Sequence, residues 1–242
     1  YLFILIGISC SAELKAQKNG TVYKGNDPAV RYTGRTLVSP DGSVAFDWVG
    51  TYLETRFTGG KLSVKVSETG TSYYYNVFVD GKLHKVVKVC GTDTLIHLVS
   101  GIDKRIHSLK IQKRSEGEFG KTTVHQFVLS GSGRLAEEPA VRTRHIEFIG
   151  NSLTCGYGTD GKHRDEPFLV ETENCNLTFA SMVARYYDAD YTLIAHSGRG
   201  AARNYGDSVR VSKVTMKDRM LNTFDEDLTH KWNFKEYRPD LV

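Results

Sequence analysis

Stretches in which apolar and polar residues alternate fill the first half of the chain. Leu62, Val64 and Val66 alternate with lysine and serine, which is the period of a strand with one buried and one solvated face. The pairs Gly59-Gly60 and Asp80-Gly81 each predict a tight hairpin turn between two strands. The strands predicted from this pattern are residues 44–48, 52–57, 62–67, 73–79, 83–89, 94–99, 106–112 and 123–129. Many short strands without a helical stretch among them predict an all-β sandwich.

The pattern changes after a polar segment without apolar periodicity, residues 133–142, which we interpret as a linker. Residues 145–150 then predict a short buried strand, residues 176–187 a helix, and residues 191–195 a second strand. Strand, helix and strand in this order are the βαβ unit of a parallel sheet. On this interpretation residues 239–242 open a third strand of that sheet.

The predicted organisation is therefore a β-sandwich over residues 21–132 and, after the linker, an α/β domain over residues 143–242. The apolar run at residues 1–8 has the length of a signal-peptide core and is too short to span a bilayer. We interpret residues 1–20 as a signal peptide and leader, which predicts a secreted or periplasmic protein without an integral membrane span. Lipoprotein attachment at Cys10 is the less favoured alternative.

Composition excludes several classes of function. The net charge of +4 comes from 32 basic and 28 acidic residues spread along the chain, so no basic block predicts nucleic-acid binding. The four cysteines lack C-x-x-C spacing, and phosphate-loop and H-E-x-x-H motifs are missing from the sequence, so we expect neither a metal nor a cofactor. Cys155 and Cys175 flank one loop, and in an exported protein they are candidates for a disulfide.

The first candidate for chemistry is Ser152, in the Gly-Asn-Ser break that ends the strand at 145–150. A serine at the tip of a buried strand, followed by glycines that let backbone N–H groups approach, suits the nucleophile of an acyl-transfer enzyme. A strand followed by a polar turn is the simpler alternative. Residues 197–200, Ser-Gly-Arg-Gly, follow the second strand, and the carboxyl ends of parallel strands meet at one edge. We therefore expect both loops at the same rim.

The segment GNSLTCGYG at residues 150–158 resembles the first sequence block of the SGNH (GDSL-type) hydrolases. The chain is also similar, over roughly residues 21–242, to the two-domain acetylesterases of carbohydrate esterase family two. The segments that carry this similarity are residues 146–150, 155–158, 171–174 and 197–200. Asn151 is a departure, because the family usually has aspartate there. The resemblance implies a jelly-roll sandwich followed by a three-layer SGNH domain that is truncated at the C-terminus.

The resemblance also implies roles for individual residues. Ser152 becomes the nucleophile, and its backbone N–H becomes one donor of the oxyanion hole. Gly200 is our choice for a second donor, with Gly198 as the alternative. The family's catalytic histidine, and the aspartate that orients it, come from a late D-x-x-H block, which we expect beyond Val242.

The other candidate acids and bases are interpreted as non-catalytic. His196 is expected on the same rim as Ser152 but belongs to the family's second sequence block, and His163 and His230 have no matching context. Glu171 and Glu173 lack the set separation that a glycosidase needs, so we expect them to make supporting polar contacts in the loop before the helix.

The function implied by the resemblance is that of a secreted carbohydrate O-acetylesterase, which removes acetyl groups from plant polysaccharide of the xylan or mannan type without a cofactor. Two alternatives stay open. A carbohydrate-binding protein with an inactive SGNH domain is consistent with Asn151 and with the lack of a placed catalytic histidine. A lipase-like or thioesterase-like SGNH hydrolase is the third interpretation.

Overall fold

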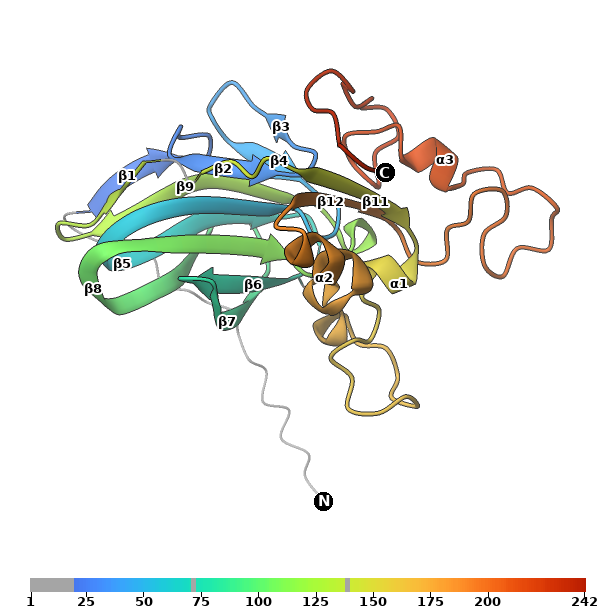
Figure 1. Cartoon of the computed structure of the whole chain (residues 1–242), viewed down its shortest axis with the longest axis horizontal. Coiled ribbons are helices and arrows are strands. Elements are labelled where there is room, and N and C mark those ends of the chain that lie inside the picture. Colours follow the sequence, from blue (N-terminus) through green and yellow to red (C-terminus); the bar gives the residue numbers. More distant parts are fainter. Residues whose placement is uncertain (1–19, 71–72, 138–139) are drawn as a thin grey trace.

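The computed structural model describes residues 20–70, 73–137 and 140–242, so Cys10 and nearly all of the expected leader lie outside the described residues. The strands between residues 20 and 135 form one ten-stranded antiparallel sheet at one end of the molecule, and residues 140–242 pack against its other end (Figure 1). The strands of this sheet are β1 (Gly20–Lys24), β2 (Val30–Thr33), β3 (Leu37–Val38), β4 (Val44–Phe46), β5 (Tyr52–Glu68), β6 (Tyr73–Val79), β7 (Lys82–Val89), β8 (Thr94–Lys113), β9 (Thr122–Ser130) and β10 (Arg134–Leu135).

The two predicted hairpins have different outcomes. Asp80 (φ 50°) and Gly81 (φ 75°) are both left-handed, as a two-residue hairpin requires, and they join β6 to antiparallel β7. The turn predicted at Gly59-Gly60 is wrong, because these glycines lie within β5, a single strand of 17 residues. β8 lies beside β5 over this length, and the register between them shifts around Gly60. The glycines therefore make a bulge that bends the strand instead of reversing it.

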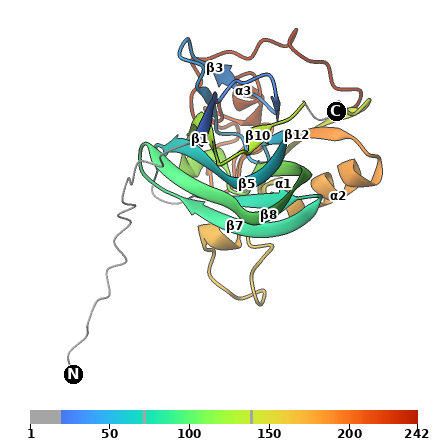
Figure 2. The ribbon, with the colours of Figure 1, turned by 90° about the vertical axis from the view of Figure 1, so that its left-hand side faces the viewer.

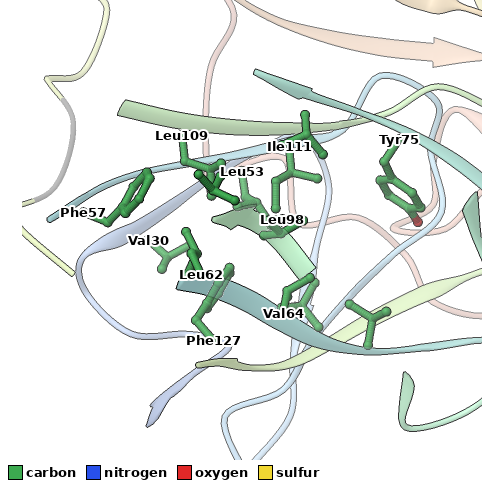
Figure 3. Packing of buried hydrophobic residues seen from close by; sticks show 14 of the residues in the cluster. Val30, Leu53, Phe57, Leu62, Val64, Tyr75, Leu98, Leu109, Ile111 and Phe127 are labelled. Carbon is green, nitrogen blue, oxygen red and sulfur yellow. The ribbon is translucent and has the colours of Figure 1, made fainter. Parts of the chain in front are cut away.

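The apolar positions of this sheet face inward and form the larger core. β5 and β8 are strongly curved (Figures 1 and 2), so that one sheet encloses the side chains that the expected sandwich would have held between two sheets. Figure 3 shows buried side chains of β2, β5, β6, β8 and β9 pointing toward one another, among them Leu62 and Val64 of the alternating stretch. Phe57, Leu62, Phe127 and Leu129 are each 0% exposed. Burial of such side chains contributes roughly 1.5 to 3 kcal/mol each.

The second part of the chain contains the expected parallel pair. β11 (His145–Gly150) and β12 (Asp190–Ala195) run parallel in register from His145↔Asp190 to Gly150↔Ala195. Leu241 adds an isolated parallel bridge to Ile146, so the end of the chain lies beside β11 as predicted. The helices are α1 (Ser152–Cys155), α2 (Phe179–Tyr186) and α3 (Met216–Arg219), with 3-10 helices η1 (Gly117–Phe119), η2 (Val170–Thr172) and η3 (Cys175–Leu177).

The expected fold class is nevertheless wrong. A three-layer α/β domain needs a broad parallel sheet with helices on both faces, whereas the only parallel sheet among the described residues has two strands. Its two faces are covered partly by the first part of the chain: Val49 packs with the small residues of α2 against Tyr191 and Leu193, while Trp48 packs with Met216 against Ile194. The molecule as a whole is mostly antiparallel sheet.

The expected disulfide is also wrong, since Cys155 and Cys175 are separate, fully buried thiols. Each Sγ has its own acceptor: the Glu116 carboxylate for Cys155, at 3.4 Å, and the Lys113 carbonyl for Cys175, at 3.3 Å.

Buried polar contacts join the two parts. The Tyr52 hydroxyl donates to Asp190 at 2.6 Å, and the Gln112 amide donates to the Tyr191 hydroxyl at 2.6 Å. Leu135, inside the predicted linker, is buried and pairs with Phe57 of β5. The domain boundary at residues 133–142 stays a prediction.

None of the helices in the described part of the chain has the length and apolar character that a membrane crossing requires.

Candidate active site

Ser152 lies where β11 turns into α1. Gly150 is required at this turn, because a Cβ there would lie 2.0 Å from the Thr154 hydroxyl oxygen. Asn151 caps the short helix: its Oδ1 accepts a hydrogen bond from the Leu153 N–H at 3.2 Å. An asparagine oxygen thus makes the local contact that an aspartate oxygen would make, without the charge. The turn leaves the Ser152 side chain half-buried at the surface.

The structure brings Ser152 together with the loop that follows β12. Both line one open cleft of about 700 Å³. The residues of its lining are Glu118, Asn151, Ser152, Tyr157, Ser197, Gly198, Arg199, Gly200, Arg203 and Tyr205. The parallel pairing of β11 and β12 explains this arrangement, because it sends both loops to one edge of the small sheet.

Two backbone N–H groups of the cleft are available for a ligand. Neither the Ser152 nor the Gly198 N–H donates to any acceptor among the described residues. Gly198 has a φ of 71°, a left-handed conformation that favours glycine. The Gly200 N–H, by contrast, donates to Oδ1 of Asn204 at 3.3 Å. Of the two glycines considered from the sequence, the free donor is therefore Gly198.

His196 directly precedes Ser197 of the cleft lining and is 1% exposed. Its Nδ1 lies 2.7 Å from Oδ2 of Asp225, and its Nε2 lies 3.4 Å from Oε2 of Glu118. Burial lowers the pKa of His196, but these two carboxylates outweigh it and raise the pKa to about 9. The imidazole is then charged at neutral pH and unable to accept the serine proton, which agrees with our interpretation of His196 as non-catalytic.

The remaining candidate histidines lie on the surface. His163 is exposed, and His230 is an exposed partner of Asp227, with Nδ1 2.6 Å from a carboxylate oxygen. Within the described ranges, the cleft lining includes no histidine. Our expectation that the histidine follows Val242 stays a prediction.

The structure contains a buried acidic pair that the sequence analysis did not predict. Glu173, expected to make only supporting contacts, is 0% exposed and lies beside Glu116, which is also 0% exposed. The Glu116 N–H donates to Oε2 of Glu173 at 3.0 Å. Burial, followed by the negative charge of Glu116, raises the pKa of Glu173 to about 9. Glu171 is exposed and accepts a hydrogen bond from the Tyr74 hydroxyl at 3.2 Å.

Two sets of side chains offer metal-ligand atoms within 4.8 Å of one another: Glu116, Cys155 and Glu173, and His196, Asp225 and Glu226. In the second set, Arg219 donates to Asp225 at 3.0 Å and to Glu226 at 2.8 Å. In the first set, Oε2 of Glu116 and Oε2 of Glu173 accept hydrogen bonds from the protein, while Oε1 of each accepts none from the described residues. We propose no metal at either set.

Aromatic rings stand at the rim of the cleft. Tyr157 is half-exposed and stacks on Phe168, with ring centroids 3.8 Å apart and planes at 13°. Tyr205 is 92% exposed. Flat aromatic surfaces at an open cleft suit the apolar faces of sugar rings.

Residues 32–139 match the family model described as "Carbohydrate esterase 2 N-terminal". Over 217 residues, 90% of this chain, the sequence is 32% identical to the cellulase/esterase CelE of Acetivibrio thermocellus. It is 31% identical over 216 residues, 86% of this chain, to an acetylxylan esterase / glucomannan deacetylase of Cellvibrio japonicus. A solved structure of a family two carbohydrate esterase from Clostridium thermocellum, in complex with cellohexaose, superposes with a TM-score of 0.82 at 31% identity over 88% of this chain.

The chain spans only part of each of these proteins. The matched share is 26% of CelE and 58% of the Cellvibrio japonicus esterase. It is 64% of the chain in the cellohexaose complex.

Proposed function

The chain belongs to carbohydrate esterase family 2, and from this premise we propose that it carries the nucleophile and oxyanion hole of a carbohydrate O-acetylesterase. Ser152 is the proposed nucleophile. The observation that carries the proposal is the meeting, in one open cleft, of the Ser152 side chain with the two unpaired N–H groups of Ser152 and Gly198.

The geometry suits acyl transfer. The Ser152 oxygen attacks the acetyl carbonyl, and the carbonyl oxygen becomes negatively charged in the tetrahedral intermediate. We propose that the N–H groups of Ser152 and Gly198 donate to that oxygen, and loss of one such donor typically costs about a hundredfold to a thousandfold in turnover. The sugar hydroxyl leaves, and water then releases acetate from the serine. A base must take the serine proton, and we propose that the late histidine block expected from the family supplies it.

The proposed substrate is acetylated polysaccharide of the xylan or glucomannan type. A cleft of about 700 Å³ that is open to solvent admits a chain of sugars, and Tyr157 and Tyr205 offer rings for stacking. The substrates in the name of the Cellvibrio japonicus relative, xylan and glucomannan, support this class. Because such polymers lie outside cells, we also propose that the protein acts after export.

A second candidate is a carbohydrate-binding protein that does not turn over substrate. It is favoured by one observation, that the cleft lining within the described part of the chain has exposed tyrosines but no histidine. The cellohexaose bound in the Clostridium thermocellum structure shows that a member of this family holds an unacetylated oligosaccharide.

One experiment separates the two candidates. Ser152→Ala in the full-length protein removes the nucleophile and leaves both N–H donors, so release of acetate from acetylated xylan should fall by roughly a millionfold. Binding to the same polymer should stay within about twofold of the parent, because the lost interaction belongs to the transition state. Ser132→Ala, at an exposed turn that is not part of the cleft lining, is the control and should leave both unchanged. A Ser152→Ala protein that releases acetate at the parent rate contradicts the esterase proposal.

A further inference from the structure

The Glu116 carboxylate connects the two loops that form the cleft. Its Oε2 accepts a hydrogen bond from the Ser197 backbone N–H at 2.6 Å and a weaker one from the Cys155 thiol at 3.4 Å. Ser197 directly precedes Gly198, and Cys155 ends the short helix that begins with Ser152. A single oxygen atom therefore fixes the distance between the nucleophile's helix and the glycine loop.

Glu116 itself comes from the first part of the chain, between β8 and η1. A buried carboxylate is costly unless hydrogen bonds replace its water. Oε2 of Glu116 accepts the two hydrogen bonds described above, but Oε1 of Glu116 accepts none from the described residues. Oε1 of Glu173 also accepts none from them. A proton held by Glu173 gives both oxygens a hydrogen-bond partner, because the protonated carboxyl of Glu173 can donate to the Glu116 carboxylate.

We propose that Glu116, braced by Glu173, is a positioning residue that holds the Ser197 N–H so that the Gly198 N–H points at the oxyanion formed beside Ser152. This inference rests on the proposed esterase function and adds a specific role for an acidic pair that touches no substrate. The Ser197 N–H lies in the peptide plane before Ser197, and the Gly198 N–H lies in the next plane. Only the φ and ψ angles of Ser197 separate the two planes, so a hydrogen bond that holds the first plane restricts where the Gly198 N–H can point. A misplacement of about 1 Å at a reacting centre can cost on the order of a hundredfold.

A structural role for the pair predicts a different result from a positioning role. If the pair serves only to fill the interior, its loss lowers stability and leaves turnover per folded molecule unchanged. If it positions the oxyanion donor, its loss lowers kcat and leaves KM nearly unchanged, because the oxyanion exists only in the transition state.

The test compares Glu116→Met with Glu116→Gln in the full-length protein, with acetylated xylan as the substrate. Methionine keeps the length of the side chain but offers no acceptor to Ser197, so kcat should fall at least tenfold while KM stays within about twofold. Glutamine keeps an acceptor for Ser197 and replaces the shared proton with an amide N–H toward Glu173, so kcat should stay within about threefold of the parent. Val64→Ala, in the distant core of the sheet, is the control for lost stability and should leave kcat unchanged.

Each result decides between specific ideas. If Glu116→Met keeps the parent kcat while Ser152→Ala is inactive, the positioning role is overturned and the esterase function stands. If Ser152→Ala remains active, the proposed function itself is wrong. Should Glu116→Met fail to fold, amide exchange of Ser197 in the parent protein tests the inference: strong protection supports it, and exchange at the rate of an unstructured peptide overturns it.

Discussion

His196 and Asp225 form a buried histidine–carboxylate pair, with Nδ1 2.7 Å from Oδ2, and His196 directly precedes Ser197 of the cleft that Ser152 lines. The arrangement looks like the base and its orienting acid in a serine hydrolase. However, Nε2 faces Glu118 at 3.4 Å, and the pKa of His196 is raised to about 9. The pair is therefore an ion pair that anchors the segment around Asp225, and we expect it to affect stability more than chemistry.

The first prediction follows from this raised pKa. A histidine that binds its proton more tightly in the folded state stabilises that state below its ordinary pKa of about 6.5, and this contribution is lost as the pH rises to about 9. His196→Asn should lower the free energy of unfolding at pH 6 and flatten its dependence on pH between about 6.5 and 9. Urea denaturation at several pH values measures both. His230→Asn, at an exposed position, is the control; an unchanged slope in His196→Asn contradicts the ion pair.

The second prediction concerns Glu173, whose pKa of about 9 is far above the ordinary value of about 4.3. The folded state keeps a proton that the unfolded state has already lost, so this group lowers the stability steadily as the pH rises between those two values. Glu173→Gln should therefore gain stability relative to the parent as the pH rises from 5 to 9. Parallel urea titrations at pH 5 and pH 9 check the sign. A difference between the two proteins that does not change with pH would show that Glu173 is ionised when folded.

The third prediction distinguishes the two glycines of the loop. A Cβ at Gly198 would meet only Tyr205, at 3.8 Å, while a Cβ at Gly200 would lie 2.1 Å from the Arg203 carbonyl oxygen. Gly198→Ala should thus cost about 1 kcal/mol of stability from its left-handed backbone and should lower kcat by at least tenfold. Gly200→Ala should mainly lower Tm. Measuring kcat per folded molecule and Tm for both proteins checks the assignment, and a normal kcat in Gly198→Ala would return the donor role to Gly200.

Local sequence patterns predicted the elements that depend on local chemistry. The Asp80-Gly81 turn, the alternation at Leu62 and Val64 and the parallel pair formed by residues 145–150 and 191–195 all agree with the structure. The hairpin predicted at Gly59-Gly60 was wrong, because a dipeptide does not reveal that β8 runs alongside β5 and pairs with it on both sides of the bulge.

The sequence did not predict that the charged residues at 113–116 are buried. Residues 113–116, Lys-Arg-Ser-Glu, have the composition of a solvated loop but are each at most 3% exposed. They are buried because their partners come from distant segments: Arg114 donates to the Glu173 carbonyl at 3.0 Å, and Glu116 binds Ser197. The prediction of a three-layer domain was wrong for a related reason, because contacts from a distant segment replace the expected layers: Trp48 and Val49 of the first part cover the small sheet.

The last prediction concerns Asn151, where the family usually has aspartate. In this chain its Oδ1 already accepts the Leu153 N–H, so Asn151→Asp should keep the turn and strengthen that bond through the added charge. We expect a small gain in Tm and acetate release from acetylated xylan within about threefold of the parent, because the side chain's contact to the chain is the same in both proteins. The measurement is acetate release together with binding to the same polymer. A rise of a hundredfold or more in release, with binding unchanged, would mean that asparagine holds the natural protein in an inactive state, and the carbohydrate-binding function would then be the better description.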